Sequence, residues 1–433
     1  MNPKIMFGQV LDLASEKINP FGTAFGNDIV LVRDLFGRIR VLLSGAKEDY
    51  DSGKINGLAA TLSGSLDRYA FPPEEILLFT SELLDGDRFF ESSDRHLLLE
   101  ENGLRLWLLD RQLMGQDWTR RPLKRETKNR RVTFFGIKGG VGRSTALVIW
   151  AWRLAKQGKD VLVIDLDLES PGLSSTLLPP AFLPDYGIVD WFVEDAVGQA
   201  DVVEHSFLAE SPLSKDLSGR IQILPAYGRD TGDYLPKLAR CYLELTGPGA
   251  AWGERLQRLV ESVERRVQPQ VTLLDSRAGL HDIAAVTVTR MDADAFLFAV
   301  DSAQTWTAYS FLFRHWKQHP QLTEFRRRLQ IVAGMVPETK REEHLRRFTE
   351  HSWDLFREHL YDEAAADNPD TYSFDLDSEE APHYPLPVFW NRALQEFDPC
   401  RSATGLDQQI AEAALGKFMT EAEHMVFAQE VGA

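Results

Sequence analysis

Short apolar runs alternate with helix-length segments through most of the chain after residue 130. The runs are four to eight residues long and rich in Val, Ile, Leu and Phe. They lie at Val132–Ile137, Val161–Ile164, Ile221–Leu224, Val271–Leu274, Ala295–Val300 and Leu329–Val336. Because the runs lack polar alternation, they predict strands that are buried on both faces and joined by helices such as Trp252–Arg266. The pattern predicts an α/β domain over residues 131–433, a mainly parallel sheet flanked by helices.

The first 119 residues follow a different pattern. Ile29–Arg33 and Arg38–Leu43 are β-rich runs that flank the turn sequence Asp-Leu-Phe-Gly, which predicts a hairpin. Ile55–Tyr69 has the pattern of a helix, and Leu104–Leu109 that of a buried strand. We expect a separate α+β domain at residues 1–119, acting as a regulatory or partner-docking module.

Two charged segments interrupt the pattern. Arg120–Arg131 holds seven basic residues against one Glu, and we expect a basic linker at residues 120–130. It is either a solvated connection or a contact for nucleic acid or an acidic partner. Tyr361–Glu380 holds eight acidic residues and no basic ones, which predicts a flexible insertion. The last helix, Leu406–Phe427, has an apolar face and an acidic side, so we expect it to pack on its own domain rather than bind membrane.

Charge and cysteine content narrow the class of protein. The chain has 48 basic and 65 acidic residues among 433, a net charge of −17. This balance argues against a nonspecific DNA coat and against an anionic membrane as the partner. The two cysteines are far apart in sequence, which indicates neither a disulfide framework nor a zinc site. Without a signal-peptide pattern or a long apolar run, we expect a cytoplasmic protein.

The loop after the first strand of the α/β domain carries the candidate chemistry. It contains Lys138, Gly139, Gly140, Val141, Gly142, Arg143, Ser144 and Thr145, in that order. Glycines let the backbone curl so that successive N–H groups point at phosphate oxygens, and the following helix adds its own free N–H groups. A plain P-loop reads GxxxxGK[ST]; here Ile137 replaces the first glycine and Arg143 the lysine.

The loop resembles the deviant Walker A loop of the ParA/MinD family, usually KGGxGK[ST], in a KGGVGR variant. The resemblance covers roughly residues 130–400. It implies a P-loop NTPase fold that binds ATP and Mg²⁺ at residues 138–145. It also implies that Lys138 reaches across a homodimer to the partner's nucleotide and takes part in catalysis. Arg143 keeps the positive charge, but its length and plane imply slow hydrolysis.

Carboxylates at the ends of two predicted strands complete the candidate site. Asp165 and Asp167 follow one run and Asp275 follows another, where a parallel sheet places its ligands. The resemblance implies that Ser144 ligates Mg²⁺, that Asp165 and Asp275 belong to the metal's surroundings, and that Asp167 orients the attacking water.

Four further residues and one segment carry weaker expectations. We expect Glu169 to face solvent and Ser170–Leu173 to break regular structure as a switch loop. Arg277 is expected to pair with a switch carboxylate or a neighbouring subunit, or to form a structural ion pair. Met335 stands where many relatives have an asparagine near the base, so Asn391 is the candidate for base contact.

Three functions remain open from the sequence. The first is an ATP-dependent molecular switch with slow ATPase activity, which dimerises around nucleotide and signals to a partner protein through the N-terminal domain. The second is an ATP-stabilised scaffold that hardly cleaves ATP, in a bacterial multi-protein system such as antiphage defence. The third is a ParA-type DNA-positioning ATPase, against which the net charge argues.

Overall fold

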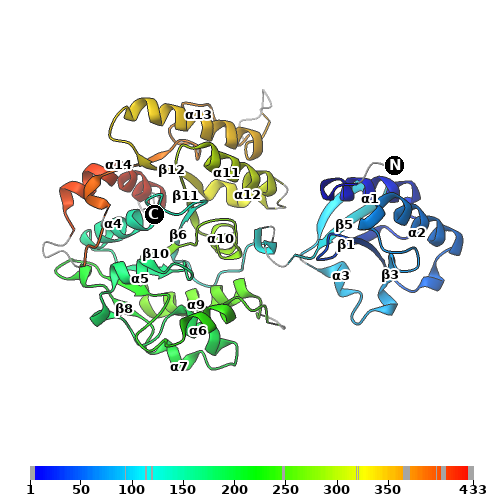
Figure 1. Cartoon of the computed structure of the whole chain (residues 1–433), viewed down its shortest axis with the longest axis horizontal. Helices are drawn as coiled ribbons and strands as arrows, with labels where there is room; N and C mark the ends of the chain where they lie inside the picture. Colours follow the sequence, from blue (N-terminus) through cyan, green and yellow to red (C-terminus); the bar gives the residue numbers. More distant parts are fainter. Residues whose placement is uncertain are drawn as a thin grey trace. The chain divides into compact units, whose positions relative to one another are not determined.

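The computed structural model describes most of the chain. The described residues are 5–92, 94–112, 115–118, 120–245, 249–317, 319, 321–363, 371–395, 397–400 and 406–427. They form two compact units, Met1–Arg120 and Arg121–Ala433 (Figure 1). Each unit has its own sheet and its own hydrophobic core.

The first unit is built on a five-stranded sheet with the order β3-β2-β1-β5-β4. Its strands are β1 (Asp28–Arg33), β2 (Ile39–Leu43), β3 (Leu77–Phe79), β4 (His96–Glu101) and β5 (Leu104–Asp110). Helices α1 (Val10–Ile18) and α2 (Ser52–Leu66) bury their apolar sides in the main core, and the short α3 (Arg88–Glu91) belongs to a smaller cluster. The predicted hairpin is confirmed, since β1 and β2 pair antiparallel. Strands β3 and β4 were not predicted.

The second unit contains an eight-stranded sheet with the order β13-β12-β11-β6-β10-β7-β9-β8. The strands are β6 (Arg130–Gly136), β7 (Val161–Asp165), β8 (Ala209–Glu210), β9 (Ile221–Leu224), β10 (Val271–Asp275), β11 (Asp294–Ala299), β12 (Leu329–Val336) and β13 (Leu386–Phe389). All neighbours pair parallel except β8 and β9. The α/β class and the six predicted strands are confirmed, and β8 and β13 are additions.

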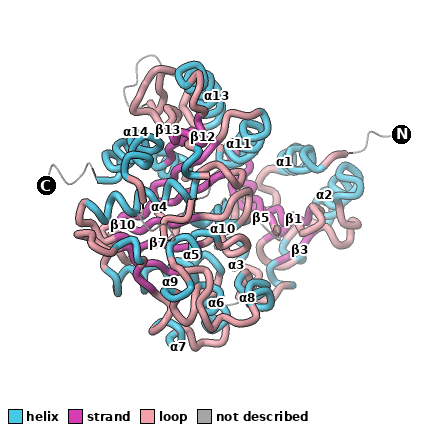
Figure 2. The backbone as a smooth tube through the Cα atoms, turned by 60° about the vertical axis from the view of Figure 1, so that its left-hand side comes forward, coloured by secondary structure: helices cyan, strands magenta, loops and turns pink. Residues whose placement is uncertain are grey.

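Helices cover both faces of this sheet (Figure 2). One face packs against α4 (Arg143–Lys156), α5 (Gly172–Leu177) and α14 (Gln408–Phe427). The other packs against α6 (Ile188–Asp195), α9 (Trp252–Val267) and α10 (Asp282–Ala285). The remaining helices are α7 (Asp201–Glu204), α8 (Tyr234–Cys241), α11 (Ala303–Trp316), α12 (Leu322–Phe325) and α13 (Arg341–His359). The prediction that the last helix packs on its own domain is confirmed.

An aromatic cluster fixes α4 and α14 on the sheet. Phe134 of β6 lies 6.0 Å from Trp150 of α4 and 5.5 Å from Phe296 of β11, measured between ring centroids. Phe418 of α14 lies 5.6 Å from Phe296. All four side chains are buried, and each aromatic side chain buries a large apolar area. The cluster therefore holds the helix that follows the glycine loop in one position.

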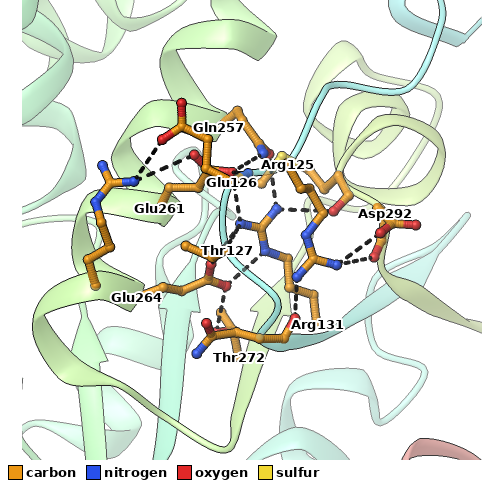
Figure 3. Close-up of polar contacts among 12 residues, drawn as sticks. Arg125, Glu126, Thr127, Arg131, Gln257, Glu261, Glu264, Thr272 and Asp292 are labelled. Atoms are coloured by element: carbon orange, nitrogen blue, oxygen red, sulfur yellow. Dashed lines mark hydrogen bonds and ion pairs between the residues drawn. The ribbon is translucent and has the colours of Figure 1, made fainter.

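The basic segment 120–130 is not the solvated linker that its charge suggested, because its second half is packed against the second unit. Arg125 donates to Asp292 over 3.0 Å (Figure 3). At the start of β6, Arg131 has a fully buried side chain and donates to both carboxylate oxygens of Glu264 over 2.8 and 2.7 Å. Arg125 and Arg131 thus form internal ion pairs, which composition alone did not reveal.

Two further expectations need correction. The acidic insertion at 361–380 is packed where it is described: Tyr361 is buried and bonds His383, and Asp362 pairs with Arg326 at 2.8 Å. Residues 364–370 lie outside the described residues. The predicted break at Ser170–Leu173 is shorter than expected, because α5 already begins at Gly172. No helix among the described residues combines the length and the apolarity needed to cross a lipid bilayer.

Candidate functional site

The glycine loop joins the carboxyl end of β6 to the first turn of α4. Gly140 and Gly142 have φ angles of 73° and 84°, in the left-handed region that favours glycine. Gly142 lies directly before α4, so its conformation turns the chain into the helix. A Cβ atom at Gly139 or Gly140 would meet no heavy atom within 4 Å. The backbone here is therefore open to a ligand beside the positive end of a helix dipole.

Two buried carboxylates lie side by side at the same sheet edge. Asp165 and Asp275 are partners in register on the adjacent parallel strands β7 and β10. Asp165 accepts hydrogen bonds from the backbone N and the Oγ of Ser174, at 2.8 and 2.6 Å. Burial, reinforced by the carboxylate of Asp275, raises the pKa of Asp165 to about 7. The site thus concentrates negative charge in a place that favours a cation.

The guanidinium of Arg143 places a positive charge beside these carboxylates. Its Nε donates to Oδ1 of Asp275 over 2.7 Å, and its Nη2 donates to Oδ2 of Asp167 over 3.1 Å. The side chain is only 8% exposed. Burial raises the pKa of Asp167, and the guanidinium opposes this effect. The resemblance had implied an arginine directed at phosphate; here it bridges the two carboxylates that follow β7 and β10.

Ser144 and Asp275 form the part of the predicted metal site that is already assembled. The hydroxyl of Ser144 donates to Oδ2 of Asp275 over 2.8 Å. Hydroxyl and carboxylate oxygens are the hard ligands that Mg²⁺ prefers, together with phosphate oxygens and waters. These two side chains fit such an ion. Asp165 fits less directly, since its Oδ2 is already bonded twice by Ser174. The described residues hold no cluster of three or more His, Cys, Asp or Glu placed to bind a metal.

The prediction that Glu169 faces solvent is wrong, because its carboxylate is held by two side chains. Its Oε1 accepts from Arg277 over 2.8 Å and from the hydroxyl of Tyr242 over 2.7 Å. The Glu169 side chain is 25% exposed. Arg277 therefore forms an ion pair within the chain, with the carboxylate that precedes the predicted switch loop. This contact fits both the switch-carboxylate and the structural ion-pair alternatives. The pair ties the loop after β10 to the loop after β7, and the helix α8 region joins through Tyr242.

Lys138 lies in the glycine loop and is partly exposed. Within the part of the chain that the structure describes, no hydrogen bond or ion pair of its ammonium group is found. Its role between subunits remains a prediction, and its freedom is compatible with a partner outside this chain.

A pocket of about 260 Å³ opens beside the glycine loop. Its lining residues come from the loop, from the ends of β12 and β13, and from α14: Gly140, Gly142, Thr145, Met335, Val388, Phe389, Trp390, Asn391, Leu394, Gln395 and Leu415. Met335 has a φ angle of 55°, which is strained for a residue with a side chain. The Oδ1 of Asn391 caps a short helical turn by accepting from the N–H of Ala393 over 2.9 Å.

The sequence indicated Met335 and Asn391 as residues near the base, but it did not predict most of the other residues that line the pocket. Phe389 and Trp390 follow a strand, β13, that is too short and too close to prolines to stand out. Leu415 was read only as part of an amphipathic helix. Ser174 carried no signal, because a serine beside glycine and proline is ordinary in loops.

Comparison with known proteins agrees with this geometry. Residues 132–305 match the family described as the CobQ/CobB/MinD/ParA nucleotide binding domain, CbiA. The match lies within the second unit, so this part of the chain is similar to that nucleotide-binding family. The second unit has a mainly parallel sheet flanked by helices, as expected for a ParA/MinD-like P-loop fold. No curated protein matches the sequence.

Several solved structures are similar to part of the chain. The structure of pNOB8 ParA bound to nonspecific DNA is 16% identical, with a TM-score of 0.41, over 69% of this chain and 97% of that one. Cobyrinic acid a,c-diamide synthase from Mycobacterium smegmatis, with bound ADP and magnesium, is 16% identical, with a TM-score of 0.41, over 69% and 96%. A ParA family ATPase from Chlorobium tepidum TLS is 12% identical, with a TM-score of 0.38, over 68% and 94%.

Proposed function

We propose that this protein is an ATP-binding molecular switch with slow, Mg²⁺-dependent hydrolysis, which forms a homodimer around nucleotide and signals to a protein partner through residues 1–119. One observation carries the nucleotide site. An open glycine loop at a helix N-terminus lies between a hydroxyl–carboxylate pair, Ser144 and Asp275, and a pocket of about 260 Å³. A nucleotide with its metal ion needs all three parts: the loop for the phosphates, the Ser144–Asp275 pair for the divalent cation and the pocket for the base.

The proposal gives each part of the site a task. Backbone N–H groups of Gly139 to Thr145 hold the phosphates. The base enters the pocket, where Met335 and Trp390 offer apolar and aromatic contacts and Asn391 offers its amide nitrogen, since its Oδ1 caps a turn. Ser144 and Asp275 hold Mg²⁺, which neutralises charge on the phosphates. The choice of adenine over guanine follows from the family resemblance and is part of the proposal.

Slow hydrolysis follows from the position of Arg143. A carboxylate polarises water less well when an ion pair neutralises its charge, and the guanidinium of Arg143 contacts Oδ2 of Asp167 at 3.1 Å. Hydrolysis therefore waits for this pair to separate. The same contact supports the second candidate function: a chain in which the pair stays closed binds ATP and acts as a stable scaffold.

A melting experiment tests the nucleotide site. MgATP and MgADP should raise the melting temperature of the whole chain, and MgGTP should do so less. A ligand that binds only the folded state at a hundredfold excess over its Kd stabilises by about 2.7 kcal/mol. Leu394→Trp, which fills the pocket, should abolish the shift. The control Leu235→Trp, at a position 73% exposed on α8, should keep it. No shift with any nucleotide would refute both the switch and the scaffold.

Lys138→Ala tests the dimer. Because Lys138 has no partner among the described residues, the variant should melt like the unmodified protein without nucleotide. With a non-hydrolysable ATP analogue, light scattering should show a dimer for the unmodified protein and a monomer for the variant. Lys340→Ala removes another lysine, 78% exposed, and should dimerise normally. A Lys138→Ala dimer of normal affinity would contradict the proposed role.

A further inference from the structure

Asp165, Asp167 and Asp275 form a carboxylate cluster at the ends of β7 and β10. Among the described residues, one guanidinium, that of Arg143, contacts this cluster. Asp165 and Asp275 are buried and Asp167 is partly buried. Arg143 touches Asp167 and Asp275 at once. Three carboxylates drawn together out of water repel one another, and each of them in isolation would be costly to bury. Arg143 is therefore the internal counter-ion that allows the cluster to form without any ligand.

The position of this guanidinium conflicts with that of a divalent cation. Both oxygens of Asp275 are engaged, Oδ1 by Arg143 at 2.7 Å and Oδ2 by Ser144 at 2.8 Å. A metal ion that takes the hydroxyl of Ser144 would approach the same carboxylate as the guanidinium. Two cations on one carboxylate repel strongly where water is excluded.

We infer that Arg143 competes with the metal for Asp275 and keeps the nucleotide-free site closed to divalent cations. This inference rests on the proposed function, because it gives the metal and the nucleotide the same site. Phosphate is an alternative partner for arginine, through charge-assisted and often paired hydrogen bonds. Incoming phosphates would draw the Nε of Arg143 from Asp275 while its Nη2 keeps Asp167, and Asp275 would then be free to hold the metal. The metal is admitted only together with nucleotide.

The identity of the residue matters for this exchange. The planar guanidinium reaches two carboxylates with two different nitrogens, Nε and Nη2. A lysine has one compact ammonium group at the end of its chain and cannot offer this fork. Arg143→Lys should therefore hold the cluster less firmly and exclude metal less well. The lysine of the usual motif and the arginine found here should therefore differ in how well they exclude a divalent cation from the nucleotide-free site.

Metal binding by the nucleotide-free protein tests the inference without any measurement of activity. Mn²⁺ is titrated into the full chain and followed by electron paramagnetic resonance. Arg143→Gln and Arg143→Ala should bind one Mn²⁺ at least about tenfold more tightly than the unmodified protein, as expected when one charge-assisted contact no longer competes. The Mn²⁺ affinity of Arg143→Lys should lie between that of these two variants and that of the unmodified protein.

Two controls separate competition from a general loss of positive charge. Arg229→Ala removes a guanidinium that is 55% exposed and pairs with Asp185, not with Asp275. It should bind Mn²⁺ like the unmodified protein. The double variant Arg143→Gln with Asp275→Asn should lose the tight site again. Circular dichroism verifies that each variant is folded, and Arg143→Lys carries the test if the other two are not.

The results distinguish the inference from the proposed function. Equal Mn²⁺ affinity of the folded Arg143 variants and the unmodified protein would overturn the inference, even if ATP binds. Equal gains in Arg143→Gln and Arg229→Ala would also overturn it, since the effect would then be one of net charge. An absent ATP-dependent melting shift would refute the proposed function, whatever the Mn²⁺ titration shows.

Discussion

Arg277 donates from Nη1 to Oε1 of Glu169 over 2.8 Å, so the loop after β10 is tied to the loop after β7. The two residues lie 108 positions apart in sequence. Tyr242 adds a second contact, through a hydroxyl that donates to the same oxygen over 2.7 Å. A change in either loop can therefore reach α8 through this contact, and the loop after β7 has a further one, because the hydroxyl of Tyr234 in α8 donates to the backbone O of Leu168.

We expect Glu169 and Arg277 to act as a unit in nucleotide binding. Glu169→Ala and Arg277→Ala should each weaken MgATP binding severalfold, and the double variant should be no worse than either. The coupling energy should be about 1 kcal/mol, because both side chains are partly exposed and screened. Isothermal titration calorimetry of the four proteins gives the cycle. Additive losses would show that the ion pair does not couple the loops.

A matched control is the ion pair of Arg229 and Asp185. Its side chains are 55% and 36% exposed, and it joins segments that do not follow β7 or β10. Arg229→Ala should leave the affinity for MgATP unchanged.

Two adjacent glycines of the loop should differ in their tolerance of a side chain. Gly140→Ala places alanine at a φ of 73° and should cost about 1–2 kcal/mol of stability without nucleotide. Gly139→Ala adds a methyl group to open space at an ordinary φ and should cost almost nothing. Urea unfolding of both variants checks this. Equal costs would mean that the loop does not hold the described conformation in solution.

The buried pair of Arg131 and Glu264 should be costly to break. Arg131→Ala leaves the carboxylate of Glu264 buried without its main partner and should destabilise the second unit by about 3–5 kcal/mol. Arg265→Ala removes an arginine that is 53% exposed and should cost less than about 1 kcal/mol. Chemical unfolding followed by tryptophan fluorescence compares them. Similar costs would contradict the burial seen for Arg131.

Asp294, at the start of β11, gives stability a predictable pH dependence. Burial raises its pKa to about 6, and Arg328 opposes the shift. Since the unfolded chain releases this proton near pH 4 and the folded chain near pH 6, the folded state binds more protons between them. The contribution of Asp294 to stability must therefore fall as pH rises through this window and remain unfavourable above it.

Asp294→Asn should remove this dependence. Unfolding in urea at pH 5 and at pH 8 should show the variant gaining stability over the unmodified protein as pH rises, with the larger gain at pH 8. A variant that is less stable than the unmodified protein at pH 8 would show that the charged form of Asp294 is favourable in the fold.

The sequence predicted the sheet of the second unit because its strands are apolar on both faces and glycine marks their turns. It also placed Asp165 and Asp275 at strand ends, since periodicity gives the ends of strands. It did not predict the partners of charged side chains. Arg131 and Arg143 look alike in sequence, yet one pairs with a helix and the other with the candidate site. Such pairing depends on the folded arrangement of segments more than 100 residues apart.

The pocket could not be predicted from the sequence for a related reason. Its walls come from the glycine loop, Met335, the residues around Trp390 and Leu415, none of which has a motif that relates it to the others. Only the parallel order of β6, β11, β12 and β13 brings them to one edge. Conversely, the acidic insertion had a clear composition but an incorrect interpretation, because Tyr361 at its start packs against Tyr372 within it.

The placement of Leu415 has a consequence for the order in which the protein matures. The ribosome makes the glycine loop first and reaches Leu415, which lines the same pocket, 270 residues after Thr145. Domains fold from the N-terminal side as they emerge. A nascent chain can thus complete its first unit and much of its second sheet while the pocket still lacks a wall. Under the proposed function, the complete base pocket is available to nucleotide only after the last helix has been made.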